Sequence, residues 1–164
     1  IVPADVGETG GFAARPAFVS ATNGRILVFT VGDAAVSTMY AKNLDTGQTS
    51  ALDPGDRHVY SAATGHLIYQ SERNVYDLWA RPFSPETLEF TGPAFPLRQN
   101  ARQPSISDDG TLAFLDSSGS TGAMTLVWRD RSGSVLEKVG QPQQTMYSPA
   151  LSPDGQRVAV YSQL

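Results

Sequence analysis

The chain has 164 residues, of which 40% are hydrophobic and 17% are charged, and its formal net charge is −4. This length and apolar content suffice for one domain with a buried core and exclude a highly charged, disordered chain. The acidic balance argues against nucleic-acid binding and against docking on anionic lipid. Because the sequence contains no cysteine, disulfides, thiolate catalysis and cysteine-ligated zinc sites are excluded.

The sequence has no apolar run approaching the roughly 18 residues that a membrane-spanning helix needs, so we expect no membrane contact by this segment. The chain begins with Ile1 rather than methionine, and no charged stretch followed by an apolar one marks a secretory leader. We therefore expect it to be a piece of a longer protein. The absence of cysteine is compatible with any compartment.

A short phrase recurs four times along the chain, at intervals of 41 to 45 residues. In each copy a serine precedes a glycine by three or four residues, and an apolar run follows the glycine, which is Gly24, Gly65, Gly110 or Gly155. Serine, aspartate and proline favour turns, and glycine adopts a positive φ without strain. Each phrase therefore predicts a tight turn between two strands, with Asp154 and the four glycines as structural turn residues. A period in the forties with strand-like content is typical of β-propeller blades.

The second strand of each repeat is the clearest, because it is an almost unbroken run of β-branched, aromatic and other apolar residues. Strands buried on both faces have this pattern, as they do between neighbouring blades. These second strands are predicted at 26–31, 67–69, 112–115 and 158–161. Third strands with a central aromatic residue are predicted at 38–43, 77–83 and 125–130, and weaker fourth strands at 48–52, 94–97 and 135–139.

The predicted fold is all-β, a partial β-propeller over residues 14–164 with about three and a half four-stranded antiparallel blades. The complete blades are expected at 14–55, 56–101 and 102–145, and residues 146–164 supply the start of a fourth. Residues 1–13 are expected to form a connector or the last strand of a preceding blade. A β-sandwich with accidental periodicity is the alternative, although a sandwich does not require the same turn phrase in every unit.

The last copy of the phrase, residues 152–160 with sequence S-P-D-G-Q-R-V-A-V, resembles the core motif of TolB-like, WD-repeat-like propellers. Residues 126–133 and 147–155 are also similar to the propeller segment attached to bacterial receptor-type serine/threonine protein kinases. This resemblance implies a sensor or protein-binding module in the periplasm or at the cell surface. The chain contains no kinase glycine-rich loop, H-R-D or D-F-G motif. Any kinase activity would therefore belong to a domain absent from this chain.

The sequence offers little for catalysis, because it has two histidines, His58 and His66, and no G-x-S-x-G elbow. We therefore expect no enzyme activity, no cofactor and no metal site, with the aspartates of the phrases acting in turns. His58, Tyr60 and Tyr147 lie on or beside first strands, which line the central channel of a propeller. These three residues are the predicted candidates for facing a ligand, and the remaining aromatic residues are expected to pack between blades.

The predicted function is a non-catalytic binding or sensing module for a protein or peptide partner. The alternatives are the gating propeller of a prolyl-oligopeptidase-like peptidase and a TolB-type cell-envelope component. Because closed propellers typically have about four to eight blades, three and a half blades leave two blade faces uncovered. Such faces usually mark interfaces, so we also expect the isolated chain to form a homodimer that completes the propeller.

Overall fold

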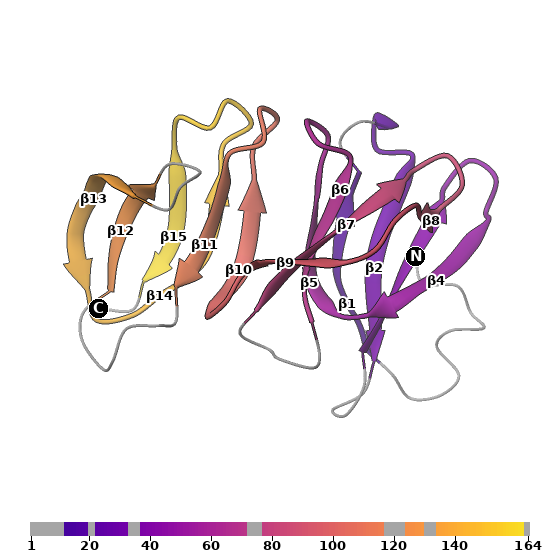
Figure 1. Ribbon diagram of the computed structural model, residues 1–164, viewed down its shortest axis with the longest axis horizontal. Coiled ribbons are helices and arrows are strands. Elements are labelled where there is room, and N and C mark those ends of the chain that lie inside the picture. Colours follow the sequence, from indigo (N-terminus) through magenta and orange to yellow (C-terminus); the bar gives the residue numbers. More distant parts are fainter. Residues whose placement is uncertain are drawn as a thin grey trace.

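The computed structural model describes residues 12–19, 22–32, 37–71, 77–116, 124–129 and 134–162, and this part of the chain forms fifteen strands and no α-helix. The strands are β1 (Phe12–Phe18), β2 (Ile26–Gly32), β3 (Ser37–Asn43), β4 (Thr49–Pro54), β5 (Asp56–Ser61), β6 (His66–Gln70), β7 (Leu78–Ser84), β8 (Glu89–Phe90), β9 (Phe95–Arg98), β10 (Ala101–Ile106), β11 (Leu112–Asp116), β12 (Met124–Arg129), β13 (Val135–Gln143), β14 (Met146–Leu151) and β15 (Val158–Ser162). Figure 1 shows them as an all-β chain, and the all-β prediction is confirmed.

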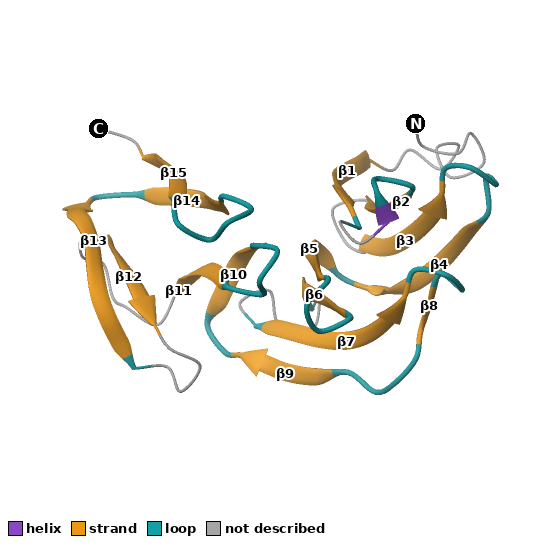
Figure 2. Cartoon of the chain, turned by 90° about the horizontal axis from the view of Figure 1, so that it is seen from above, coloured by secondary structure: helices purple, strands orange, loops and turns teal. Residues whose placement is uncertain are grey.

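The first two repeats form complete antiparallel sheets. Unit one has the strand order β1-β2-β3-β4, and unit two has the order β5-β6-β7, with both β8 and β9 pairing with β7 at the outer edge. Seen from above in Figure 2, the units follow one another in an arc, with β1, β5, β10 and β14 on its concave side and β4, β9 and β13 on its convex side. This radial order of sheets is that of propeller blades.

The third repeat departs from the predicted four-stranded sheet. β10 pairs with β11 and β12 pairs with β13, but no ladder joins β11 to β12 in the described part of the chain, so unit three consists of two separate hairpins. Residues 117–123, which connect them, are all serine, glycine, threonine or alanine. Such a segment has no large side chain that could fix a strand register by packing. Unit four is represented by the hairpin β14-β15.

Some strand boundaries also differ from those predicted. β1 begins at Phe12, inside the segment 1–13 predicted as a connector, and β10 begins at Ala101, which was placed at the end of the second blade. The outer edge of unit two is divided between β8 and β9, whereas the sequence predicted one strand at 94–97. The apolar content of the outer strands is too low to fix their ends from the sequence.

The largest buried core lies in units one and two. Its fully buried members come from β2, β3 and β6, as well as from loops, and include Val28, Met39 and Leu67, which are at most 1% exposed. β2 is buried along its first five residues and β6 along its last four. The prediction that these second strands are covered on both faces is therefore confirmed for units one and two.

The repeated turns owe their shape to local hydrogen bonds. The Ser107 hydroxyl donates to Asp109 Oδ1 at 2.6 Å, and the same oxygen accepts the Thr111 backbone N–H at 2.9 Å. In the fourth copy Ser152 and Asp154 make the same bond at 2.5 Å. All four repeated glycines have a positive φ, between 68° and 88°. In units three and four these side-chain bonds shape the turn, and in all four units a glycine with a positive φ completes it.

Successive turns also pack on one another. The Asp108 backbone N–H donates to the Pro153 carbonyl at 3.0 Å, which joins the turns of units three and four. A Cβ atom at Gly110 would lie 3.2 Å from the Cβ of Ala63, in the turn of unit two, and one at Gly155 would lie 3.3 Å from Ser107 Oγ. Figure 1 shows these hairpin turns gathered at one end of the molecule. The phrase therefore also holds neighbouring units together.

Candidate functional site

The concave side of the arc carries the same irregularity in every unit. Each first strand has one more residue than the segment of second strand that it pairs with, which is a β-bulge. The bulges lie between the ladder positions Ala14 and Ala17, Asp56 and Val59, Arg102 and Ser105, and Tyr147 and Ala150. Bulges locally bend a strand and redirect its side chains.

Three of the four bulges begin with a non-glycine residue in the left-handed region. Arg57, Gln103 and Ser148 have φ angles of 49°, 55° and 51°. The residue after each is buried and is His58, Pro104 or Pro149. Proline suits this place because it has no N–H to leave unpaired in a disrupted ladder. Since a positive φ is uncommon outside glycine, its recurrence at one position of the repeat shows that the fold imposes it.

Side chains of one unit complete the hydrogen bonding of the next bulge. Gln70 Oε1 accepts the backbone N–H of Gln103 at 3.0 Å, and Gln103 Oε1 accepts the backbone N–H of Ser148 at 2.5 Å. A bulge leaves such an amide without a ladder partner, and an unpaired buried amide is costly. The glutamines therefore fix the position of each inner strand relative to the unit before it.

His58 performs the corresponding task between units one and two. It is 4% exposed; Nε2 lies 2.9 Å from the Val28 carbonyl oxygen, and Nδ1 lies 3.3 Å from Thr30 Oγ1. A carbonyl oxygen only accepts, so Nε2 carries a proton and donates it to Val28; in the neutral ring Nδ1 accepts from the threonine hydroxyl. The prediction that His58 faces a ligand is therefore wrong, because the bulge turns its ring into the interface with unit one.

The other two predicted residues lie in different units. Tyr60, on β5, is half-buried with its ring 6.1 Å from that of Phe83, and burial raises the pKa of its hydroxyl. Tyr147, on β14, stacks on Tyr161 with the ring centroids 6.2 Å apart. The structure does not bring Tyr60 and Tyr147 together, and their contact with a ligand stays a prediction.

The bulge residues Arg57, Gln103 and Ser148 were missed by the sequence interpretation. The sequence did contain a signal for this position. In units one, three and four the first bulge residue is followed by a proline, which is Pro16, Pro104 or Pro149. In the structure Arg57 and Gln103 are half-buried and Ser148 is exposed. The guanidinium of Arg57 lies 4.0 Å from Asp56. The inner strands of units two to four thus carry a polar residue at the same left-handed backbone position.

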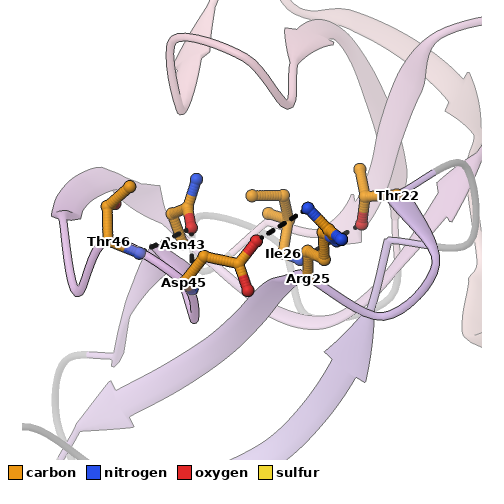
Figure 3. Close-up of polar contacts among 6 residues, drawn as sticks. All are labelled: Thr22, Arg25, Ile26, Asn43, Asp45 and Thr46. Carbon is orange, nitrogen blue, oxygen red and sulfur yellow. Dashed lines mark hydrogen bonds and ion pairs between the residues drawn. The ribbon is translucent and has the colours of Figure 1, made fainter.

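A shallow groove of about 390 Å³ lies between the turns of units one and two and is lined by Thr22, Asn23, Arg25, Ile26, Asn43, Asp45, Pro85 and Glu86. Figure 3 shows the polar contacts on its unit-one side. Polar groups of its lining bond to one another or to nearby backbone: Arg25 pairs with Asp45 at 3.0 Å, and Asn43 Oδ1 accepts two backbone N–H groups. These contacts stabilise the turns, and the groove gathers no convergent set of donors for a ligand.

Among the residues that the structure describes, no group of three or more histidine, aspartate or glutamate side chains is placed to hold a metal ion. No helix long and apolar enough to cross a membrane occurs there either.

Comparison with known proteins places the fold. No protein-family model and no curated protein sequence matches the chain. Among solved structures it is similar to TolB from Acinetobacter baumannii, with a TM-score of 0.64 and 23% identity over 87% of this chain and 36% of that one. It is also similar to the β-propeller domain of the Trilobed protease from Pyrococcus furiosus, with a TM-score of 0.51 and 15% identity over 93% of this chain and 49% of that one. The chain thus spans less than half of each, and its fold is a TolB-like β-propeller.

Proposed function

We propose that this chain is a non-catalytic binding module that holds a protein or peptide ligand on the concave side of the arc. The observation that carries the proposal is the repeated left-handed residue at the inner-strand bulges, Arg57, Gln103 and Ser148. Strained backbone positions of this kind persist where the surrounding structure imposes them, and they cluster at binding sites. Bulges are likewise frequent beside functional sites, where they redirect side chains.

The chemistry of the three side chains suits an extended peptide. A guanidinium, a carboxamide and a hydroxyl all donate hydrogen bonds, and an extended peptide presents a carbonyl oxygen at every residue. The glutamine bonds between units hold the three bulges in fixed relative positions. A preformed site loses little conformational entropy when it binds.

A peptide-display selection against the full chain tests this proposal. Selected peptides are then measured by titration calorimetry against Ser148→Trp, which places a large side chain on the concave side, and against Ala51→Trp, on the exposed outer strand β4. The proposal expects at least about tenfold weaker binding for Ser148→Trp and unchanged binding for Ala51→Trp. Equal affinities for both variants would place the binding surface elsewhere.

The wider context of the module is a separate part of the proposal. The similarity of residues 126–133 and 147–155 to kinase-attached propellers supports a sensor segment of a receptor-type serine/threonine kinase. The coding sequence on either side of this chain tests it, because a kinase domain in the same reading frame is expected. A hydrolase domain there would instead favour a peptidase gating propeller, and the absence of both would favour a TolB-type envelope component.

A further inference from the structure

Unit three lacks the ladder between second and third strands that units one and two possess. β2 and β3 are joined by seven ladder pairs and β6 and β7 by five, whereas β11 and β12 share none in the described part of the chain. In Figure 2 the hairpin β12–β13 lies on the outer side of β11, as β3 and β4 lie outside β2. The strands of unit three are therefore in blade order, but the facing edges of β11 and β12 are not joined.

An aromatic pair crosses the corresponding ladder in each of the other two units. Phe29 lies opposite Tyr40, with the ring centroids 5.7 Å apart, and Tyr69 lies opposite Trp79. Directly opposed side chains are the main stabilising contacts of a sheet, and aromatic pairs contribute strongly. The aromatic pair therefore helps to fix the register of both ladders.

The third repeat carries an aromatic residue at both of the corresponding places. In units one and two, the aromatic residue of the second strand directly precedes the residue that pairs with the first strand just before the bulge. In unit three this residue is Phe114, which directly precedes Leu115. The aromatic residue of the third strand follows an apolar residue, which in unit three gives Val127 and Trp128. The repeat thus predicts a register in which Trp128 lies opposite Phe114 and Val127 opposite Leu115.

The outer part of unit two is exposed on the side that faces unit three. Phe95 pairs with Ala80, which pairs with Ile68, so the three side chains share one face of the sheet. Gln70 lies on the same face, two residues beyond Ile68, and bonds to Gln103 of unit three. Phe95 is nevertheless 42% exposed. An apolar surface directed at unit three is therefore left partly open.

The equivalent part of unit one is covered by unit two. Met39 and Ala41 of β3 are 0% exposed, and Trp79 of β7 packs against the core to which they belong. Trp128 has the place of Trp79 in the repeat, but its strand is not joined to β11. The surface around Phe95 is thus open where its counterpart in unit one lies beneath a neighbouring blade.

We propose that the hairpin β12–β13 closes on β11 by antiparallel pairing, with Trp128 opposite Phe114, and that the closed blade covers Phe95. Pairing satisfies the backbone groups along the two facing edges. Met124 follows Asp116 by only eight residues, so the ladder closes a short loop at little cost in chain entropy. The gain is set against the entropy of ordering the hairpin, and the structure shows the open form.

Paired cysteines test the register, because the chain has no cysteine of its own. Asp116→Cys with Leu126→Cys places the two thiols directly opposite each other in the closed blade. Asp116→Cys with Met124→Cys is the matched control, two residues out of register on the same face. Disulfides need Cα atoms roughly 4.4 to 6.8 Å apart, which opposed strand residues provide and a two-residue slip does not.

The rate of disulfide formation under mild oxidation, followed by mass spectrometry, is the measurement. The in-register pair is expected to react at least about tenfold faster than the control. The control cysteines are closer in sequence, so random encounter in an open hairpin would favour the control instead. Circular dichroism of the reduced proteins verifies that they are folded. Ala113→Cys with Arg129→Cys samples the same register and replaces the first pair if that variant does not fold.

A second measurement asks whether closure covers Phe95. Phe95→Lys is added to the in-register cysteine variant, and its urea midpoint is measured with the disulfide formed and reduced. The substitution is expected to lower the midpoint more in the cross-linked protein, where a charged side chain would lie beneath the closed blade. Leu44→Lys is the control, because Leu44 is also 42% exposed but lies in unit one, and its effect should be the same in both forms.

The outcomes that overturn the proposal are separate for its two parts. Equal rates for the two cysteine pairs, or no disulfide from either in folded protein, would show that β12 does not pair with β11 in this register. A Phe95→Lys effect that the cross-link leaves unchanged would show that the closed hairpin does not cover unit two.

Discussion

Units one and two differ from units three and four although all four repeats share the same phrase. β2 and β6 are buried almost along their whole length, whereas β11 has one buried residue and β15 has none. The second strands are similarly apolar in sequence, and their surroundings differ. The first two have a third strand beside them and a neighbouring sheet to pack against, so burial follows the number of neighbours rather than the hydrophobicity of the strand.

The arginines that pair across the unit boundaries differ in how many further contacts they make. Between units one and two, Arg81 pairs with Asp53, and within unit two it also donates to the Gly92 carbonyl at 2.7 Å and lies over the Phe90 ring. Between units two and three, Arg98 pairs with Asp116 at 3.1 Å; Arg98 is more exposed than Arg81, and Asp116 is less exposed than Asp53. The turns depend less on their neighbours, because the bonds that shape each turn join residues within five positions of one another, as the serine–aspartate bonds of units three and four do.

The strongest test of this difference compares two leucines at the same place in the repeat. Leu67 pairs with Tyr60 and is 0% exposed, and Leu112 pairs with Ile106 and is half-buried. Leu67→Ala should lower the free energy of unfolding by about 3 kcal/mol and Leu112→Ala by about 1 kcal/mol, because only the first leaves a closed cavity. Urea denaturation of the two variants provides the measurement. Equal losses would mean that unit three is as well packed as unit two.

The two inter-unit arginines provide a second, smaller contrast. Arg81→Met should lower the free energy of unfolding by about 1 to 2 kcal/mol, since it removes an ion pair, a carbonyl bond and a cation–π contact together. Arg98→Met removes one exposed ion pair and should cost about 0.5 kcal/mol. Thermal melts at low and at high salt would compare them. A larger loss for Arg98→Met than for Arg81→Met would contradict the conclusion that Arg81 makes the more stabilising contacts.

Glycine substitutions test how far each turn depends on packing against the turn of the neighbouring unit. Gly65 and Gly110 have φ angles of 70° and 88°, and a Cβ at Gly65 meets nothing within 4 Å, whereas one at Gly110 approaches Ala63. Gly65→Ala should cost about 1 kcal/mol for the left-handed backbone alone, and Gly110→Ala up to about 2 kcal/mol. Denaturant melts of both variants are the measurement. A loss for Gly110→Ala no larger than that for Gly65→Ala would show that the turns of units two and three do not pack together.

The smallest expected effect concerns the turn of unit four. The Ser152 hydroxyl, followed by the Gln156 backbone N–H, holds the pKa of Asp154 below its ordinary value of 3.8. Since these bonds favour the ionised form, their contribution is present above pH 4 or so and is lost as the pH falls through the lowered value. Carbon-13 NMR titration should show the pKa of Asp154 rising in Ser152→Ala. An unchanged titration would mean that the turn does not hold the carboxylate.

The sequence by itself determined the elements whose causes are local. The serine–aspartate–glycine phrases define their turns because the hydrogen bonds span at most five residues, and the apolar runs after them define the second strands because β-branched and aromatic side chains favour extended backbone. Counting these phrases was enough to predict radially arranged repeats and the all-β class.

Only the tertiary structure decided which strands are covered and where side chains of the concave face point. His58 is on an inner strand as predicted, yet a bulge turns it into the unit-one interface, and Arg57, Gln103 and Ser148 take the left-handed backbone positions of the bulges. Tyr161 and Thr30 occupy the same place in the repeat and differ in exposure because a neighbouring inner strand covers Thr30. Burial and the direction of the His58 ring depend on residues about 30 to 45 positions away along the chain, and such long-range contacts leave no pattern within a single repeat.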